Sequence, residues 1–126
     1  MRKAGVLMPV SALPSRVGAG ELGEAAFHFI ELLKKNHVKI WQILPLNPVG
    51  YGNSPYQPYS SCAGDEIYIS LDKLAEDGLL KTAPEAFLQN AKRVDYEAVR
   101  QYREPFLREA FEVFTKKKGQ EESAYK

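Results

Sequence analysis

IWQILP, residues 40–45, gives the clearest indication of the fold class in this sequence. It is a short, continuous apolar run that ends at a proline. Such a run is typical of a strand that is buried on both faces of a parallel sheet. A second run of the same kind, AGVLMP, occupies residues 4–9. Each run is therefore expected to form one buried strand.

Residues 24–36 lie between the two runs and have the pattern of an amphipathic helix. The apolar side chains recur at the spacing i, i+3, i+4 and i+7: Ala26, Phe29, Ile30 and Leu33. Acidic residues come early in the segment and basic residues late, which matches the helix macrodipole. A strand, a helix and a strand with short joints make a βαβ unit, so the sequence predicts an α/β fold with parallel strands.

Helices are predicted for most of the remaining chain. IYIS, residues 67–70, favours a short strand, and LDKLAEDG, residues 71–78, favours a short helix that ends at its glycine. Thr82 and Glu85 have the spacing of a capping box at the start of another helix of about two turns. Asp95 is expected to cap a long last helix.

The last helix has an apolar stripe: Val99, Tyr102, Phe106, Ala110 and Val113. Pro105 lies inside this stripe and is expected to kink or break the helix, because proline lacks the backbone N–H and clashes with the preceding turn. The chain then ends in the polar segment KKKGQEESAYK, residues 116–126.

Composition is that of an ordinary globular domain. The chain has 126 residues, of which 44% are hydrophobic and 26% charged, and its net charge is +1. This balance provides no field that attracts nucleic acid, and no apolar run approaches the ~20 residues that cross a bilayer. The single cysteine, Cys62, fits a reducing compartment. We therefore expect a cytoplasmic protein with neither nucleic acid nor a membrane as its partner.

GAGELG, residues 18–23, matches the glycine pattern of dinucleotide-binding folds, but its surroundings do not. In those folds the first glycine follows the strand directly, and an acidic residue comes about 20 residues later. Here eight residues intervene after Pro9, and residues 38–50 contain no acid. The motif is therefore predicted to be a flexible turn that starts the helix.

The other reactive side chains favour structural roles. His28 and His37 have no partners at metal-ligand spacing, so both are expected at the surface or its boundary. Cys62 has no neighbouring base in the sequence, which favours a small packed thiol. Five acidic residues are expected on helix surfaces: Asp65, Glu66, Asp72, Glu76 and Asp77.

GYGNSPYQPYSS, residues 50–61 and hereafter the tyrosine loop, combines three tyrosines with neutral polar residues and no charge. Aromatic faces together with Asn53, Ser54 and Gln57 suit a neutral, hydroxyl-rich ligand with apolar C–H faces, which describes a sugar. The loop also follows the carboxyl end of a predicted parallel strand, where α/β folds place their sites. A packed loop whose tyrosines cap the core is the alternative, and the residues alone leave both open.

Three segments resemble the N-terminus of the amylomaltases, the 4-α-glucanotransferases also called disproportionating enzymes. They are ALPSRVGAGELG (residues 12–23), IWQILPLNPVGYGNSPYQPYSSCAG (residues 40–64) and RVDY (residues 93–96). The resemblance implies an N-terminal fragment of a (β/α)8 TIM barrel. This single segment, residues 1–126, would hold the first two parallel strands and a mainly helical insertion from about residue 72.

The resemblance also implies the chemistry. Amylomaltases transfer α-1,4-glucan segments between maltooligosaccharides by a retaining double displacement, with an Asp nucleophile, a Glu acid/base and no cofactor. A barrel takes about 250 residues. The catalytic pair is therefore expected beyond Lys126, the isolated chain is expected to be inactive, and its partners would be α-1,4-glucans and the remainder of the barrel. A stand-alone glucan-binding module without catalysis is the alternative.

Five residues of the tyrosine loop match the family's glucan site. Tyr56 matches the tyrosine that packs on the sugar at the cleaved bond. The others match residues around the glucan: Tyr51, Asn53, Ser54 and Gln57. The chain departs from the family pattern in having Asn53 for Asp, and Asp-Glu-Ile at residues 65–67 for Asn-Pro-Tyr. These departures bear on how the end of the loop is anchored.

Overall fold

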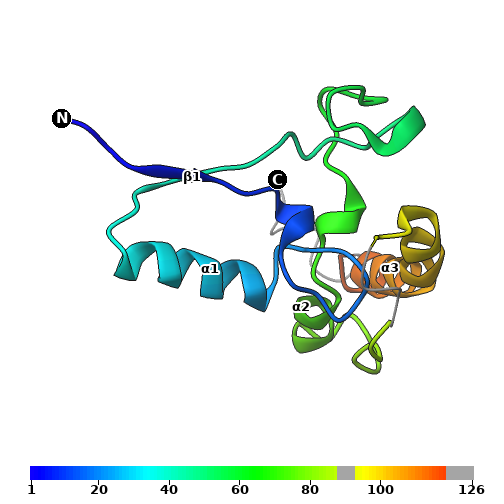
Figure 1. The fold of residues 1–126 in the computed structure, drawn as a ribbon. Helices are drawn as coiled ribbons and strands as arrows, with labels where there is room; N and C mark the ends of the chain where they lie inside the picture. Colours follow the sequence, from blue (N-terminus) through cyan, green and yellow to red (C-terminus); the bar gives the residue numbers. More distant parts are fainter. Residues whose placement is uncertain (88–92, 119–126) are drawn as a thin grey trace.

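The predicted βαβ unit is present. The computed structural model describes residues 1–87 and 93–118. Strand β1 (Gly5–Leu7), helix α1 (Glu24–Lys35) and strand β2 (Ile40–Gln42) follow one another, and β1 and β2 pair in parallel. Figure 1 shows α1 running back along the two strands.

Helix α1 packs on the sheet through an aromatic pair. The ring of Phe29 meets the ring of Trp41 edge-on, with centroids 5.0 Å apart. The indole Nε1 of Trp41 donates a hydrogen bond of 2.8 Å to the backbone oxygen of Met8, which follows β1. Helix and both strands therefore meet at Trp41, while Glu24 in the first turn and two lysines in the last turn complement the macrodipole.

The expectation that both strands are buried on both faces is wrong for this chain. Leu7 is 57% exposed and Ile40 is 46% exposed. The described residues form a sheet of only two strands, and parallel sheets bury both faces only where further elements cover them. Both strands therefore carry apolar side chains that this chain does not cover.

The strand predicted at residues 67–70 is also wrong. A 3-10 helix, η3 (Glu66–Tyr68), takes its place, because the Asp65 carboxylate accepts a hydrogen bond of 3.0 Å from the Ile67 amide and turns the backbone. Helix α2 (Leu71–Glu76) follows as predicted. The Ser70 hydroxyl caps its start by accepting from the Lys73 amide, 3.3 Å away.

No helix forms at residues 82–87, although Thr82 and Glu85 have capping-box spacing. This segment bonds to its neighbours instead: the Phe87 amide donates to the Arg16 oxygen over 2.7 Å, and the Arg16 guanidinium donates to the Pro84 oxygen over 2.6 Å. The remainder of that predicted helix lies outside the described residues.

Helix α3 (Tyr96–Lys118) is the predicted long helix. The Asp95 carboxylate accepts a hydrogen bond of 3.1 Å from the Ala98 amide at its start. Pro105 does not break the helix, which continues through it. The polar ending beyond Lys118 lies outside the described residues.

Two small clusters form the core. In one, Val10 and Leu13 are buried against Ala26 of α1. In the other, Ala19 and Ile67 are buried against Val99 of α3. Tyr68, which is half-buried, packs against both clusters. Figure 1 shows α2, α3 and the loops that follow β1 and β2 gathered beyond the carboxyl ends of the strands. Among residues 1–87 and 93–118, no helix is long and apolar enough to cross a membrane.

Candidate functional site

The tyrosine loop is closed at its base. The Asp65 amide donates a hydrogen bond of 2.7 Å to the oxygen of Leu46, just after β2. Beside it, the Asn47 side-chain amide donates to the Ala63 oxygen over 2.8 Å. We call these facing segments, residues 46–47 and 63–65, the neck. Because the neck joins both ends of the loop, the chain leaves the end of β2, forms the loop and returns to the point where it left.

The tip of the loop is shaped by local turns. The 3-10 turn η2 (Tyr51–Asn53) contains Gly52 with φ of 76° and Asn53 with φ of 53°. Glycine and asparagine are the residue types that tolerate this left-handed region. The Tyr56 amide then donates a hydrogen bond of 3.3 Å to the Ser54 hydroxyl. The backbone geometry of the loop tip therefore depends on Asn53 and Ser54, two of the residues predicted for the glucan site.

The predicted site residues lie together on this loop, with different exposures. Asn53, Tyr56 and Gln57 are exposed, and Ser54 is half-buried. The Tyr56 side chain is 71% exposed, so its ring does not cap the core of this chain. The side chain of Tyr51 lies outside the described part of the structure.

A pocket of about 370 Å³ lies between the loop, the neck and α3. Its lining includes Pro9 and Leu44, which follow β1 and β2, so the pocket lies near the carboxyl ends of the strands, where barrel enzymes carry their sites. Asn53 and Pro55 contribute from the loop. The rest of the lining combines apolar residues such as Val10 and Ile67 with four polar or aromatic ones: Asp65, Tyr68, Tyr96 and Arg100. The tyrosine loop and α3 therefore line the same pocket.

An ion pair joins the neck to α3. The Arg100 guanidinium meets both carboxylate oxygens of Asp65, at 2.6 and 2.9 Å, and reaches Glu66 at 3.2 Å. The Asp65 side chain is only 1% exposed, so its prediction as helix surface is wrong. Burial opposes ionisation of Asp65, but hydrogen bonds from Arg100 and the Ile67 amide, with the Arg100 charge, outweigh it and lower the pKa of Asp65.

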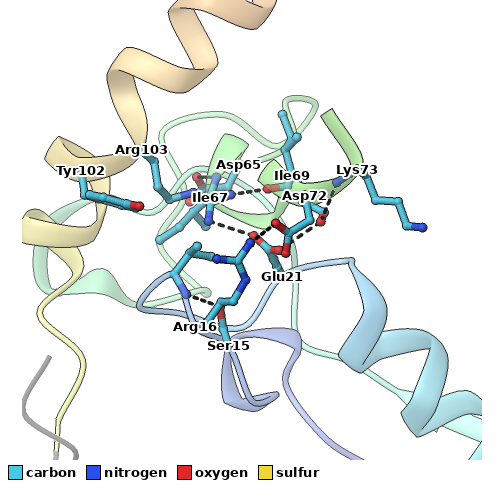
Figure 2. A network of polar contacts seen from close by, with 12 residues as sticks. Ser15, Arg16, Glu21, Asp65, Ile67, Ile69, Asp72, Lys73, Tyr102 and Arg103 are labelled. Carbon is cyan, nitrogen blue, oxygen red and sulfur yellow. Dashed lines mark hydrogen bonds and ion pairs between the residues drawn. The ribbon is translucent and has the colours of Figure 1, made fainter. Parts of the chain in front are cut away.

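A second arginine of α3 holds the loop that follows β1. Arg103 is 1% exposed, and its guanidinium lies 2.9 Å from a Glu21 carboxylate oxygen. It also donates to the Ile69 oxygen, and the Ser70 hydroxyl donates to Glu21 over 3.0 Å. Figure 2 shows Arg103 pointing from α3 toward Glu21, with Arg16 pairing with Asp72 nearby.

Sequence reasoning missed these carboxylate–arginine pairs, although one signal was available. Arg103 lies four residues after Val99 and seven before Ala110, so it falls on the buried stripe of the helix. A charged residue on such a stripe requires a partner. No comparable signal in the sequence marks Asp65, because its partner is 35 residues away.

The glycines of GAGELG have structural explanations. Gly18 has φ of 98°, and a Cβ on Gly20 would lie 2.0 Å from the backbone oxygen of Val10. The motif leads into α1, as predicted, and its flexibility stays a prediction. His28 and His37 are exposed, which agrees with their prediction as surface or boundary residues, whereas Cys62 is exposed and its prediction as a packed thiol is wrong. In the described part of the chain, no three metal-ligating side chains form a group.

Comparison with known proteins gives a consistent result. Residues 8–126 match the family model for 4-alpha-glucanotransferase. The 4-alpha-glucanotransferase of Synechocystis is 45% identical over 118 residues, which cover 90% of this chain and 23% of that protein. The enzyme of the same name from Thermus thermophilus is 41% identical over 121 residues, covering 96% of this chain and 24% of its own length.

A solved structure agrees with these relatives. The amylomaltase from Streptococcus agalactiae, in complex with acarbose, has a TM-score of 0.85 and 36% identity, covering 92% of this chain and 24% of that one. This chain therefore spans about a quarter of the length of the relatives it matches. Its two parallel strands and their helix have the architecture of the N-terminal part of a (β/α)8 barrel. The chain belongs to the 4-alpha-glucanotransferase family.

Proposed function

We propose that this chain is the part of a 4-α-glucanotransferase that supplies one wall of the donor glucan site. The observation that carries the proposal is the 71% exposed ring of Tyr56 on a loop closed at its neck, beyond the carboxyl end of β2. An exposed aromatic ring on a well-fixed loop is suited to cover the C–H face of a sugar.

The chemistry proposed for the whole enzyme is transfer of α-1,4-glucan segments by retaining double displacement. An Asp nucleophile and a Glu acid/base, both outside this chain, would carry the covalent steps. The loop would bind and orient the donor. Tyr56 would do so by ring contact with the sugar. Four polar side chains of the loop would form hydrogen bonds with it: Tyr51, Asn53, Ser54 and Gln57. The helical insertion from about residue 72 and the cytoplasmic location remain predictions.

Prolines on both sides of Tyr56 support this role. Pro55 and Pro58 restrict the backbone before and after the ring, so little conformational entropy is lost when a sugar stacks on it. If ring contact improves as the sugar flattens toward its oxocarbenium-like state, Tyr56 stabilises the transition state more than the substrate.

Substitution of Tyr56 in the complete enzyme tests the proposal, with maltotriose as substrate. We expect Tyr56→Ala to lower the rate constant of transfer by about 30- to 150-fold, which corresponds to about 2–3 kcal/mol. Tyr59→Ala is the matched control, because Tyr59 is an 83% exposed tyrosine of the same loop with no assigned role. Normal transfer by folded Tyr56→Ala would reject the donor-site assignment. Binding of maltooligosaccharides without transfer by the unsubstituted protein would favour the stand-alone module.

A further inference from the structure

The neck of the tyrosine loop has a charged connection to α3, the ion pair of Asp65 with Arg100. Asp65 is also the first charged residue after Lys39, because no ionisable acid or base lies between them apart from tyrosines and Cys62. We propose that Arg100, acting through Asp65, is a positioning residue for the glucan site. The Asp65–Arg100 ion pair, hereafter the clasp, holds the neck against α3 and so fixes the position of Tyr56. This inference rests on the proposed function of the loop.

Asp65 connects three parts of the molecule at once. Its backbone amide bonds to Leu46 at the end of β2, and its carboxylate receives the Ile67 amide at the start of η3. Its two carboxylate oxygens then meet the two terminal nitrogens of Arg100 on α3. A bidentate pair fixes orientation as well as distance, which a single contact does not.

The pair also faces the loop that it would position. Asp65 and Arg100 line the same pocket of about 370 Å³ as Asn53 and Pro55, which precede Tyr56. A shift of the neck relative to α3 would therefore change the wall against which this part of the loop rests. Because the Asp65 side chain is 1% exposed, loss of Arg100 would leave a buried carboxylate without its cation, and the neck would open to hydrate it.

The rest of α3 is held independently of this pair. Arg103 bonds to Glu21 and Ile69, and Val99 is fully buried in the second core cluster. Breaking the Asp65–Arg100 pair should therefore loosen the neck without detaching the helix. The expected effect is a smaller fraction of molecules with the loop in its binding position, which raises KM in proportion while kcat stays nearly constant.

Asp65→Asn and Arg100→Gln in the complete enzyme test the clasp. The Asn side chain keeps an oxygen that can accept from the Ile67 amide, so Asp65→Asn isolates the loss of charge. Arg108→Gln is the matched control, since Arg108 is an exposed arginine of α3 that pairs with Glu104 on its own helix, 2.7 Å away.

Two measurements decide the outcome. Hydrogen exchange should become at least about threefold faster in residues 49–60 of both variants, while residues 24–35 of α1 stay unchanged. KM for maltotriose should rise about 5- to 20-fold with kcat within about threefold. The double variant should be no worse than either single variant, because both remove the same interaction.

The results separate the clasp from the proposed function. Unchanged loop exchange and KM, or additive effects in the double variant, would overturn the clasp even if Tyr56→Ala impairs transfer. Equal acceleration of exchange in α1 would overturn it too, since the pair would then stabilise the whole fold. Normal transfer by Tyr56→Ala would instead reject the glucan site, while a faster-exchanging loop would still support the mechanical role of Arg100.

Discussion

Two arginines on one face of α3 reach carboxylates in the loops that follow the two strands. Arg103 meets Glu21 after β1, and Arg100 meets Asp65 after β2. They lie three positions apart, so both point to the same side of the helix. Their burial differs: the Arg103 side chain is 1% exposed and that of Arg100 is 31% exposed. Loss of either arginine would leave a largely buried carboxylate without its cation, since the Glu21 side chain is 10% exposed and that of Asp65 is 1% exposed.

Arg103→Met in the complete enzyme should lower the free energy of unfolding by about 3–5 kcal/mol, since it leaves the Glu21 carboxylate buried without a cation. Adding Glu21→Gln should recover a large part of this loss by removing the unpaired charge. Urea unfolding at neutral pH measures both effects. Arg108→Met is the control and should change the value by less than about 1 kcal/mol, because its pair with Glu104 is exposed. A loss at Arg103 no larger than this control would contradict a structural role for the buried pair.

At the scale of elements, local patterns were readable in the sequence and distant pairings were not. The βαβ unit and α3 were predicted because apolar periodicity and a capping residue lie within each segment. η3 replaced a predicted strand because Asp65 turns the chain there and is held by Arg100, 35 residues away. Likewise, residues 82–87 bond to Arg16 instead of forming a helical turn.

The candidate site was likewise predictable from the sequence where its signal is local, and not where residues distant in the sequence meet. Composition alone marked the tyrosine loop, because uncharged aromatic and polar residues are concentrated in one short stretch. The neck and the clasp needed the fold, since Leu46, Asp65 and Arg100 meet only after the chain has turned back on itself. The resemblance located the departure at residues 65–67 but did not provide its partner on α3.

The turn before α1 needs a glycine at residue 20, where it comes very close to the backbone of Val10. A Cβ on Gly20 would lie 2.0 Å from the Val10 oxygen, which belongs to the backbone and cannot rotate away as a side chain can. Gly20→Ala should therefore lower the free energy of unfolding of the complete enzyme by about 3 kcal/mol, the upper range for overpacking. Gly64→Ala is the matched control, with nothing within 4 Å of the added atom, and should change stability by under about 1 kcal/mol. Equal stability of both variants in urea would show that the turn adapts.

On the scale of the whole chain, apolar side chains remain exposed where the barrel would continue. Leu7 and Ile40 on the strands are 57% and 46% exposed, and Phe27 and Leu32 on α1 are 57% and 55% exposed. The two-stranded parallel sheet also leaves backbone groups unpaired along its outer edges. In an intact (β/α)8 barrel, neighbouring strands and helices cover such surfaces. These exposures therefore belong to a part of a larger fold.

The isolated residues 1–126 should consequently associate, or be only marginally stable, with a free energy of unfolding below about 5 kcal/mol. Light scattering should give a mass above the 14.2 kDa of one chain. Trp41, the single tryptophan, lies half-buried in β2 and reports on this region by its fluorescence. Leu7→Lys with Ile40→Lys should reduce association while helix content is retained, because both positions are exposed and lie on the strands that would pair between chains. A monomer with a sharp cooperative melt would contradict the prediction, since it would mean that α1, α3 and the loops complete a core without the remaining strands.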